Sequence, residues 1–81
     1  MDNDYFVIMQ YINREIEILK LIRDCITEKM LCIQEEMKVD KKADKRIIVS
    51  LLKKYSDEYE QEIIKCYDKK RRINKIFQNH K

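Results

Sequence analysis

The sequence of 81 residues contains no glycine and no proline. Tight turns between β-strands rely on these two residues, and loops that bind phosphate groups rely on glycine. Their absence argues against β-sandwiches, β-barrels, P-loop proteins and dinucleotide-binding folds. We therefore expect an all-α protein, and the length allows one small domain over residues 1–81.

Histidine and cysteine are also scarce, with one histidine, His80, and three cysteines that form no CxxC pair. A structural zinc site needs four ligands, so we expect no metal and no cofactor. Cys25 and Cys32 are two helical turns apart, about 10 Å, which is too far for a disulfide bond. We therefore expect all three cysteines, Cys66 included, to be buried apolar side chains in a reducing compartment, the cytoplasm.

Long apolar runs are absent as well. A membrane span needs about 20 apolar residues, and the sequence contains no run of that length. The short apolar run at residues 5–9 follows the acidic residues Asp2 and Asp4, whereas a secretion signal begins with basic residues. We expect neither a membrane span nor a secretion signal.

Apolar residues at helical spacing are the main feature that is present. Over residues 4–38, one row repeats every seven residues and consists of Ile12, Leu19, Ile26 and Ile33. A parallel row beside it consists of Tyr11, Ile18, Cys25 and Cys32. Both repeats predict a helix over residues 4–38. The combined stripe is wider than the seam of a two-stranded coiled coil, so this helix should have more than one neighbour.

A second helix is predicted over residues 45–78. Its apolar residues recur at spacings of three, four and seven, and they are Ile48, Leu52, Tyr55, Tyr59, Ile63, Cys66, Ile73 and Phe77. The segment between the helices, residues 39–44, is nearly all charged, and Asp40 or Asp44 is a candidate cap for the second helix. We expect a turn here and two long antiparallel helices, a helical hairpin. A single unbroken helix is the alternative.

Two helices in contact along one line cannot cover both broad apolar stripes. We therefore expect either two hairpins that pair into a four-helix bundle, as a homodimer, or a helix of a partner protein on the stripe. The residues predicted to anchor this interface are Ile12, Leu19, Ile26, Ile33, Leu52, Tyr59 and Ile63. The leading hypothesis is a non-enzymatic protein–protein interaction module, such as a small adaptor, regulator, inhibitor or chaperone-like subunit.

The net charge is +3, from 18 basic and 15 acidic residues, and basic residues gather near the end of the second helix. A basic cluster there is a candidate for contacts with nucleic-acid phosphates, and it consists of Lys69, Lys70, Arg71, Arg72 and Lys75. Asp68 is expected to pair with Arg72, four residues later. Nucleic-acid binding by a helical dimer is thus the alternative function. Insertion of Ile73, Ile76 and Phe77 into an anionic membrane is a less favoured use of the same segment.

Catalytic residues are not recognisable, because a nucleophilic triad needs a histidine beside serine or cysteine and the chain has only His80. We expect no enzymatic activity. The segment Ser56-Asp57-Glu58-Tyr59-Glu60 resembles the Ser-Gln-Glu-Leu-Asp motif of the small aspartyl-phosphate phosphatases that act on the sporulation response regulator, which are also helical hairpins. The resemblance implies a third function, dephosphorylation of a response regulator, with Glu60 in place of the motif's functional aspartate, Asp57 in place of its glutamine and Tyr59 in place of its leucine.

Overall fold

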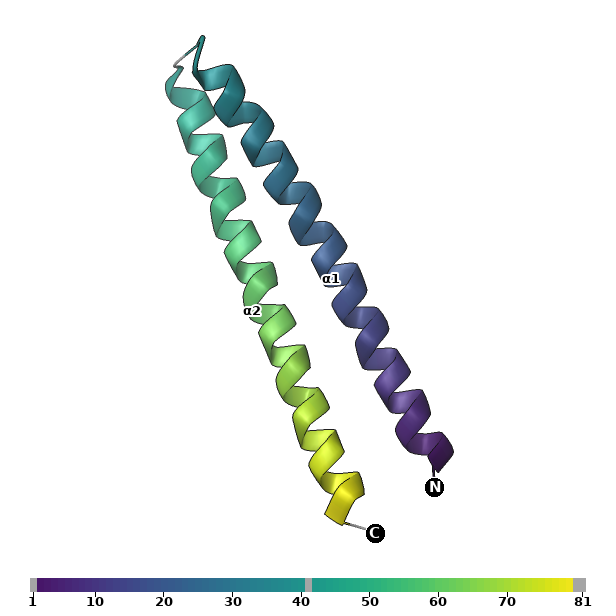
Figure 1. The fold of residues 1–81 in the computed structure, drawn as a ribbon. Helices are drawn as coiled ribbons and strands as arrows, with labels where there is room; N and C mark the ends of the chain where they lie inside the picture. The colour runs from purple at the N-terminus through teal and green to yellow at the C-terminus, as the bar shows by residue number, and fades with distance from the viewer. Residues whose placement is uncertain (1, 41, 80–81) are drawn as a thin grey trace.

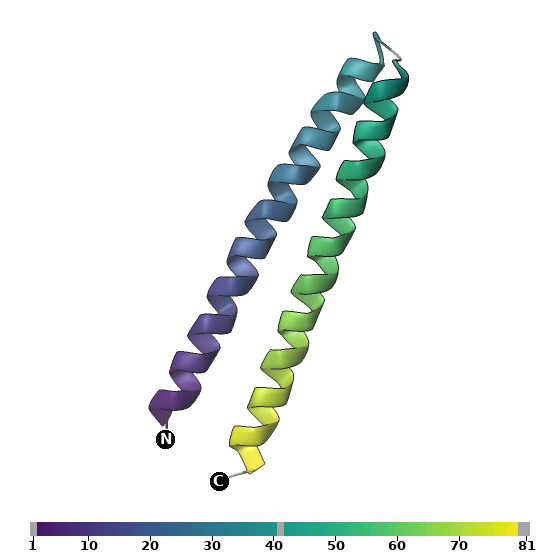
Figure 2. The same cartoon turned by 180° about the vertical axis from the view of Figure 1, so that it is seen from behind.

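The computed structural model describes residues 2–40 and 42–79. Helix α1, Asp2–Met37, and helix α2, Ala43–Asn79, run antiparallel and form a helical hairpin (Figure 1). Seen from behind, the helices lie side by side along their whole length, and their free ends lie opposite the turn (Figure 2). The predicted all-α hairpin is confirmed, and the alternative of one unbroken helix is wrong. The single histidine, His80, lies outside the described residues.

The helices begin and end within two residues of the expected positions. Helix α1 covers residues 2–37 where 4–38 was expected, and α2 covers 43–79 where 45–78 was expected. The backbone N–H groups of Val39 and Asp40 donate to the Glu36 carbonyl at 3.1 and 3.0 Å, which closes the end of α1.

The aspartates of the turn do not cap α2 as expected. Within the described residues, no backbone N–H group of α2 donates a hydrogen bond to the carboxylate of Asp40 or Asp44. The Asp40 carboxylate instead lies 3.6 Å from the Nζ atom of Lys45. Asp44 lies inside the first turn of α2, where its negative charge interacts favourably with the helix dipole.

The core is a single line of contact between α1 and α2. Its most buried side chains are Ile12, Ile16, Ile33, Ile63 and Cys66. Leu19 and Ile73 pack against the cluster of Ile12, Ile16, Ile63 and Cys66. At the free end of the hairpin, the rings of Tyr5 and Phe77 meet edge to face with centroids 5.1 Å apart. Burial is therefore confined to one narrow seam.

The outline of the hairpin is long and thin, 61 × 15 × 13 Å. Its accessible surface is 6780 Å². A compact monomer of this mass exposes about 5,200 Å². The hairpin thus exposes about 1,500 Å² more surface than a compact fold of the same mass.

Candidate interaction surface

The seven residues predicted to anchor an interface all lie where α1 and α2 contact each other. Ile12, Ile33 and Ile63 are buried, and Leu19, Ile26, Leu52 and Tyr59 are half-buried. These side chains already pack within the chain. A surface for another molecule must therefore be sought on the sides of the hairpin.

One side of the hairpin carries polar contacts that cross between the helices, and we call it the polar face. The Lys20 ammonium donates to the Tyr67 hydroxyl at 2.9 Å, and Arg23 Nη1 donates to Glu60 Oε2 at 2.6 Å. Arg23 lies within the seam, four residues after Leu19, and its side chain is only 26% exposed. The hydrogen bond that Arg23 donates to Glu60 raises the pKa of the Arg23 guanidinium, so this side chain stays charged.

On the opposite side, charged residues of both helices lie near the Cys66 thiol and influence its pKa. They are Glu15 of α1 and Glu62 and Lys69 of α2. Tyr11 and Ile18 lie four residues before and three residues after Glu15, so they belong to this side of α1. They are 76% and 52% exposed. An apolar row of α1 is thus open to solvent.

We call this side the apolar face. It comprises Val7, Ile8, Tyr11, Ile18, Leu21, Ile22, Cys25 and Cys32 of α1, and Ile48, Leu51 and Tyr55 of α2. All of these side chains are exposed except Ile22, which is half-buried. The apolar face follows α1 for most of its length and continues onto α2 near the turn.

The cysteine prediction is wrong for two of the three residues. Cys25 and Cys32 are exposed, and only Cys66, at 2% exposure, is buried. Cys25 and Cys32 belong to the row that points away from the seam, so no side chain of α2 covers them. Burial raises the pKa of the Cys66 thiol above its ordinary value of 9.0, and the nearby Glu15 carboxylate raises it further.

Four charged residues border the apolar face on α1. Arg14 and Glu15 lie in its first half, and Glu28 and Lys29 lie in its second half. Within residues 2–40 and 42–79, none of the four forms an ion pair. Their charges are therefore free to interact with a molecule on this face.

The basic cluster near the end of α2 is spread around the helix. Lys70 is half-buried over the Tyr67 ring, 5.7 Å from its centroid. Asp68 pairs with Arg71 and not, as expected, with Arg72. The remaining basic residues are exposed and form no ion pair within the part of the chain that the structure describes, and they are Lys69, Arg72 and Lys75. Lys69, Arg72 and Lys75 are three residues apart and lie side by side on α2, whereas Lys70 and Arg71 point elsewhere, so the five residues do not form one patch.

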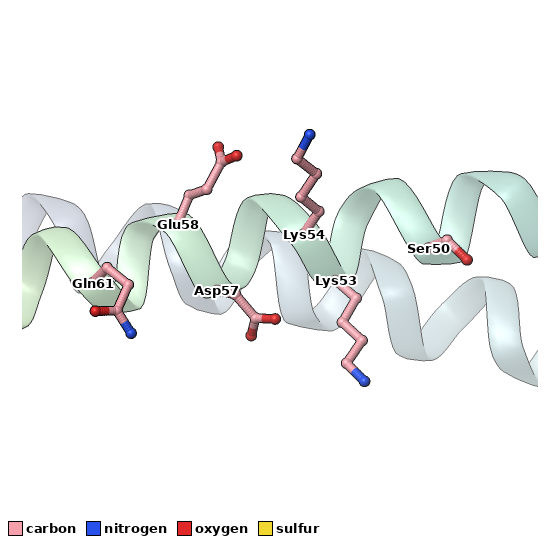
Figure 3. Close-up of a pocket in the computed structure, with 6 residues that line it drawn as sticks. All are labelled: Ser50, Lys53, Lys54, Asp57, Glu58 and Gln61. Carbon is pink, nitrogen blue, oxygen red and sulfur yellow. The ribbon is translucent and has the colours of Figure 1, made fainter.

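A shallow hollow on the outer surface of α2 is lined by side chains of that helix alone, namely Ser50, Lys53, Lys54, Asp57, Glu58 and Gln61. Lys54 and Glu58 project to one side of the helix and Lys53 and Asp57 to the other (Figure 3). Helix α1 contributes no residue, so the hollow is open surface without an enclosing wall.

Sites for metals, membranes or phosphoryl chemistry are not visible in the described ranges. Residues 2–40 and 42–79 contain no group of three or more His, Cys, Asp or Glu side chains placed to hold a metal ion. Neither α1 nor α2, over the same ranges, has a stretch apolar enough to cross a bilayer. Glu60, to which the phosphatase resemblance gives the functional position, is held by Arg23 across the two helices.

Comparison with known proteins gives no relative for this chain: no protein-family model, no curated protein and no solved structure matches it.

Proposed function

We propose that this chain is a non-enzymatic protein–protein interaction module that binds through its apolar face. The observation that carries the proposal is the exposed apolar row of α1, which faces away from the core and extends from Val7 to Cys32. Contiguous apolar surface beyond a few hundred Å² marks interaction sites on soluble proteins. The unpaired cysteines fit a reducing compartment such as the cytoplasm.

The energetic argument rests on the amount of surface that remains open. The chain exposes about 1,500 Å² more than a compact monomer of its mass. Burial of apolar surface contributes about 25 cal/mol per Å² to stability. A partner that buries the apolar face would therefore stabilise the bound state substantially. Helices pack on one another along just such rows at spacings of three and four residues.

Site-specific photocrosslinking tests this function. A photoreactive amino acid at Ile18, on the apolar face, should give crosslinked protein adducts in cells that produce the chain. The matched control carries the same group at Glu17, an exposed neighbour whose side chain points about 100° away, and should give none. Equal labelling at the two positions, or no adduct at position 18, would contradict the proposal.

Nucleic-acid binding is a second candidate, and the free charges of Lys69, Arg72 and Lys75 favour it. Contacts between such charges and phosphates release counterions, so the affinity should fall steeply as salt rises. Triple replacement of these residues by Glu should remove binding to duplex RNA or DNA. The control is Lys53→Glu with Lys54→Glu, a like-signed change outside the cluster. Binding that survives the triple replacement would dismiss this candidate.

A further inference from the structure

We propose that a second copy of this chain covers the apolar face, antiparallel to the first, across a two-fold axis that passes between Leu21 and Ile22. This inference rests on the proposed function, because it names the partner of the same face. It also fixes which residues meet across the interface.

The surface that the thin hairpin leaves open is large enough for a dimer interface. A stable interface buries about 800 Å² on each partner, and the hairpin exposes about 1,500 Å² beyond a compact fold. The apolar face runs along most of α1 in a molecule 61 Å long. A second hairpin offers an apolar row of the same length, and a two-fold axis pairs the row with itself.

Between Tyr11 and Cys32, the apolar residues on α1 meet apolar residues in this register. Leu21 and Ile22 meet their own copies at the axis. Moving outward, Ile18 lies opposite Cys25 of the second copy, and Tyr11 lies opposite Cys32 of the second copy. The two cysteines that are exposed in one hairpin are thereby covered.

The charges that border the face are complementary in the same register. Glu15 lies opposite Lys29 of the second copy, and Arg14 lies opposite Glu28 of the second copy. The axis generates each of these pairs twice. The four resulting ion pairs favour a second copy of this chain as the occupant of the apolar face.

The same axis also suits α2. Arg23 pairs with Glu60, and Tyr5 packs on Phe77, so the level between Leu21 and Ile22 corresponds to the neighbourhood of Gln61. An axis at this level brings together three further pairs across the two copies of α2: Ile48 with Ile76, Tyr55 with Lys69, and Glu58 with Lys65. These are an apolar pair, a cation–π pair and an ion pair.

One like-charged meeting results from this axis. Glu62 approaches its own copy near the centre of the α2 pair. Lys65 of the same chain offsets part of this repulsion, because its Nζ atom lies 3.1 Å from Glu62 Oε1. The four helices then form one assembly, with α1 against α1 and α2 against α2.

A designed disulfide tests the register directly. The variant Ile18→Cys with Cys32→Ser carries thiols at positions 18 and 25. Within one chain these are about 10 Å apart and cannot bond, so a disulfide between them must join two chains. We expect oxidation to give a covalent dimer whose linked peptides contain positions 18 and 25. The control, Cys32→Ser alone, should stay uncrosslinked.

Charge reversal tests the same register without cysteine chemistry. Light scattering should give wild-type chain a mass of twice the 10.0 kDa of one chain. Glu15→Lys should weaken the dimer about tenfold or more, because it places two lysines opposite one another at two equivalent sites. Adding Lys29→Glu should restore the dimer. Glu17→Lys, the same change outside the apolar face, should have no effect.

The outcomes separate this inference from the proposed function. A crosslink between Cys25 and Cys25 in the control, or a double variant no tighter than Glu15→Lys alone, overturns the antiparallel register. A mass of one chain at all concentrations overturns the second copy as occupant. Photocrosslinked adducts at position 18 with a different protein would then leave the proposed function standing, and their absence would remove both.

Discussion

Ile63 and its neighbour Ile64 have the same side chain in opposite environments. Ile63 is 2% exposed in the seam, whereas Ile64 is 45% exposed on the outside of α2. Removal of a buried side chain loses its burial and leaves a cavity, while removal of an exposed one loses little.

We predict that Ile63→Ala lowers the free energy of unfolding by about 2–4 kcal/mol. Ile64→Ala, the matched control, should change it by about 0.5 kcal/mol or less. Urea unfolding followed by circular dichroism measures both. Similar losses for the two variants would mean that the seam does not hold the hairpin together.

Cys66 is the other deeply buried side chain of α2, and its raised pKa makes the stability depend on pH. Below pH 9.0, the thiol is protonated in both the folded and the unfolded chain. Above it, the unfolded chain loses the proton while the folded chain keeps it, so the unfolded state gains stability.

We predict that the free energy of unfolding of the wild type falls as the pH rises above 9 through the raised pKa of Cys66. Cys66→Ala should show a smaller fall over the same interval, because it has no thiol to titrate. Urea titrations of both proteins at pH 7.5 and pH 10 measure the difference. Parallel curves would show that Cys66 does not contribute.

At the scale of the helices, polar residues interrupt the apolar seam at one level. Arg23 pairs with Glu60, and the hydroxyl groups of Thr27 and Ser56 lie 3.5 Å apart nearby. A polar group in a helix–helix seam fixes the relative register of the helices, because a shift would leave it without a partner. This layer thus favours one alignment of α1 with α2.

We predict favourable coupling between Arg23 and Glu60. Arg23→Ala and Glu60→Ala should each lower the urea midpoint, and the double variant should lose less than the sum of the two. High salt should shrink this coupling, since both side chains reach the surface. The measurement is a double-mutant cycle at low and high salt, and strict additivity would show that the pair does not act together.

The seven-residue repeats could be predicted from the sequence, but which of the two repeats faces the other helix could not. The row from Ile12 to Ile33 and the row from Tyr11 to Cys32 are both apolar at the same spacing, and that spacing predicts a helix for either. Only the first faces α2, and this choice depends on how the two helices pack. Arg23 and Glu60 were missed as seam residues because charged side chains are typical of exposed positions. The second row, with Leu21 and Val7 beside it, was the available signal for an outer interface.

At the scale of the whole molecule, the hairpin is thin, 61 × 15 × 13 Å, so the side chains that the structure describes all lie close to solvent. Five buried residues make up its core over the described ranges. Small chains bury too little surface to be comfortably stable alone. Assembly would therefore add stability that depends on protein concentration.

We predict that the thermal midpoint of the wild type rises with protein concentration. Leu21→Asp should remove this dependence, because it places a charge at the centre of the apolar face, where Leu21 is 65% exposed in the single hairpin. Lys54→Asp, on the outer surface of α2, should keep it. Calorimetry over a hundredfold concentration range checks the prediction, and a midpoint independent of concentration in the wild type would contradict it.

The simple connectivity also sets an order for folding. Contacts beside the turn join residues close in sequence, whereas Tyr5 and Asn74, hydrogen-bonded at the free end, are 69 positions apart. Closing a short loop loses less chain entropy than closing a long one, so contacts form at least cost next to the turn. The hairpin should thus form its helix–helix contacts first beside the turn and last at its free ends, and it should fray in the reverse order. Amide hydrogens near Tyr5 and Phe77 should therefore exchange long before those near Ile33.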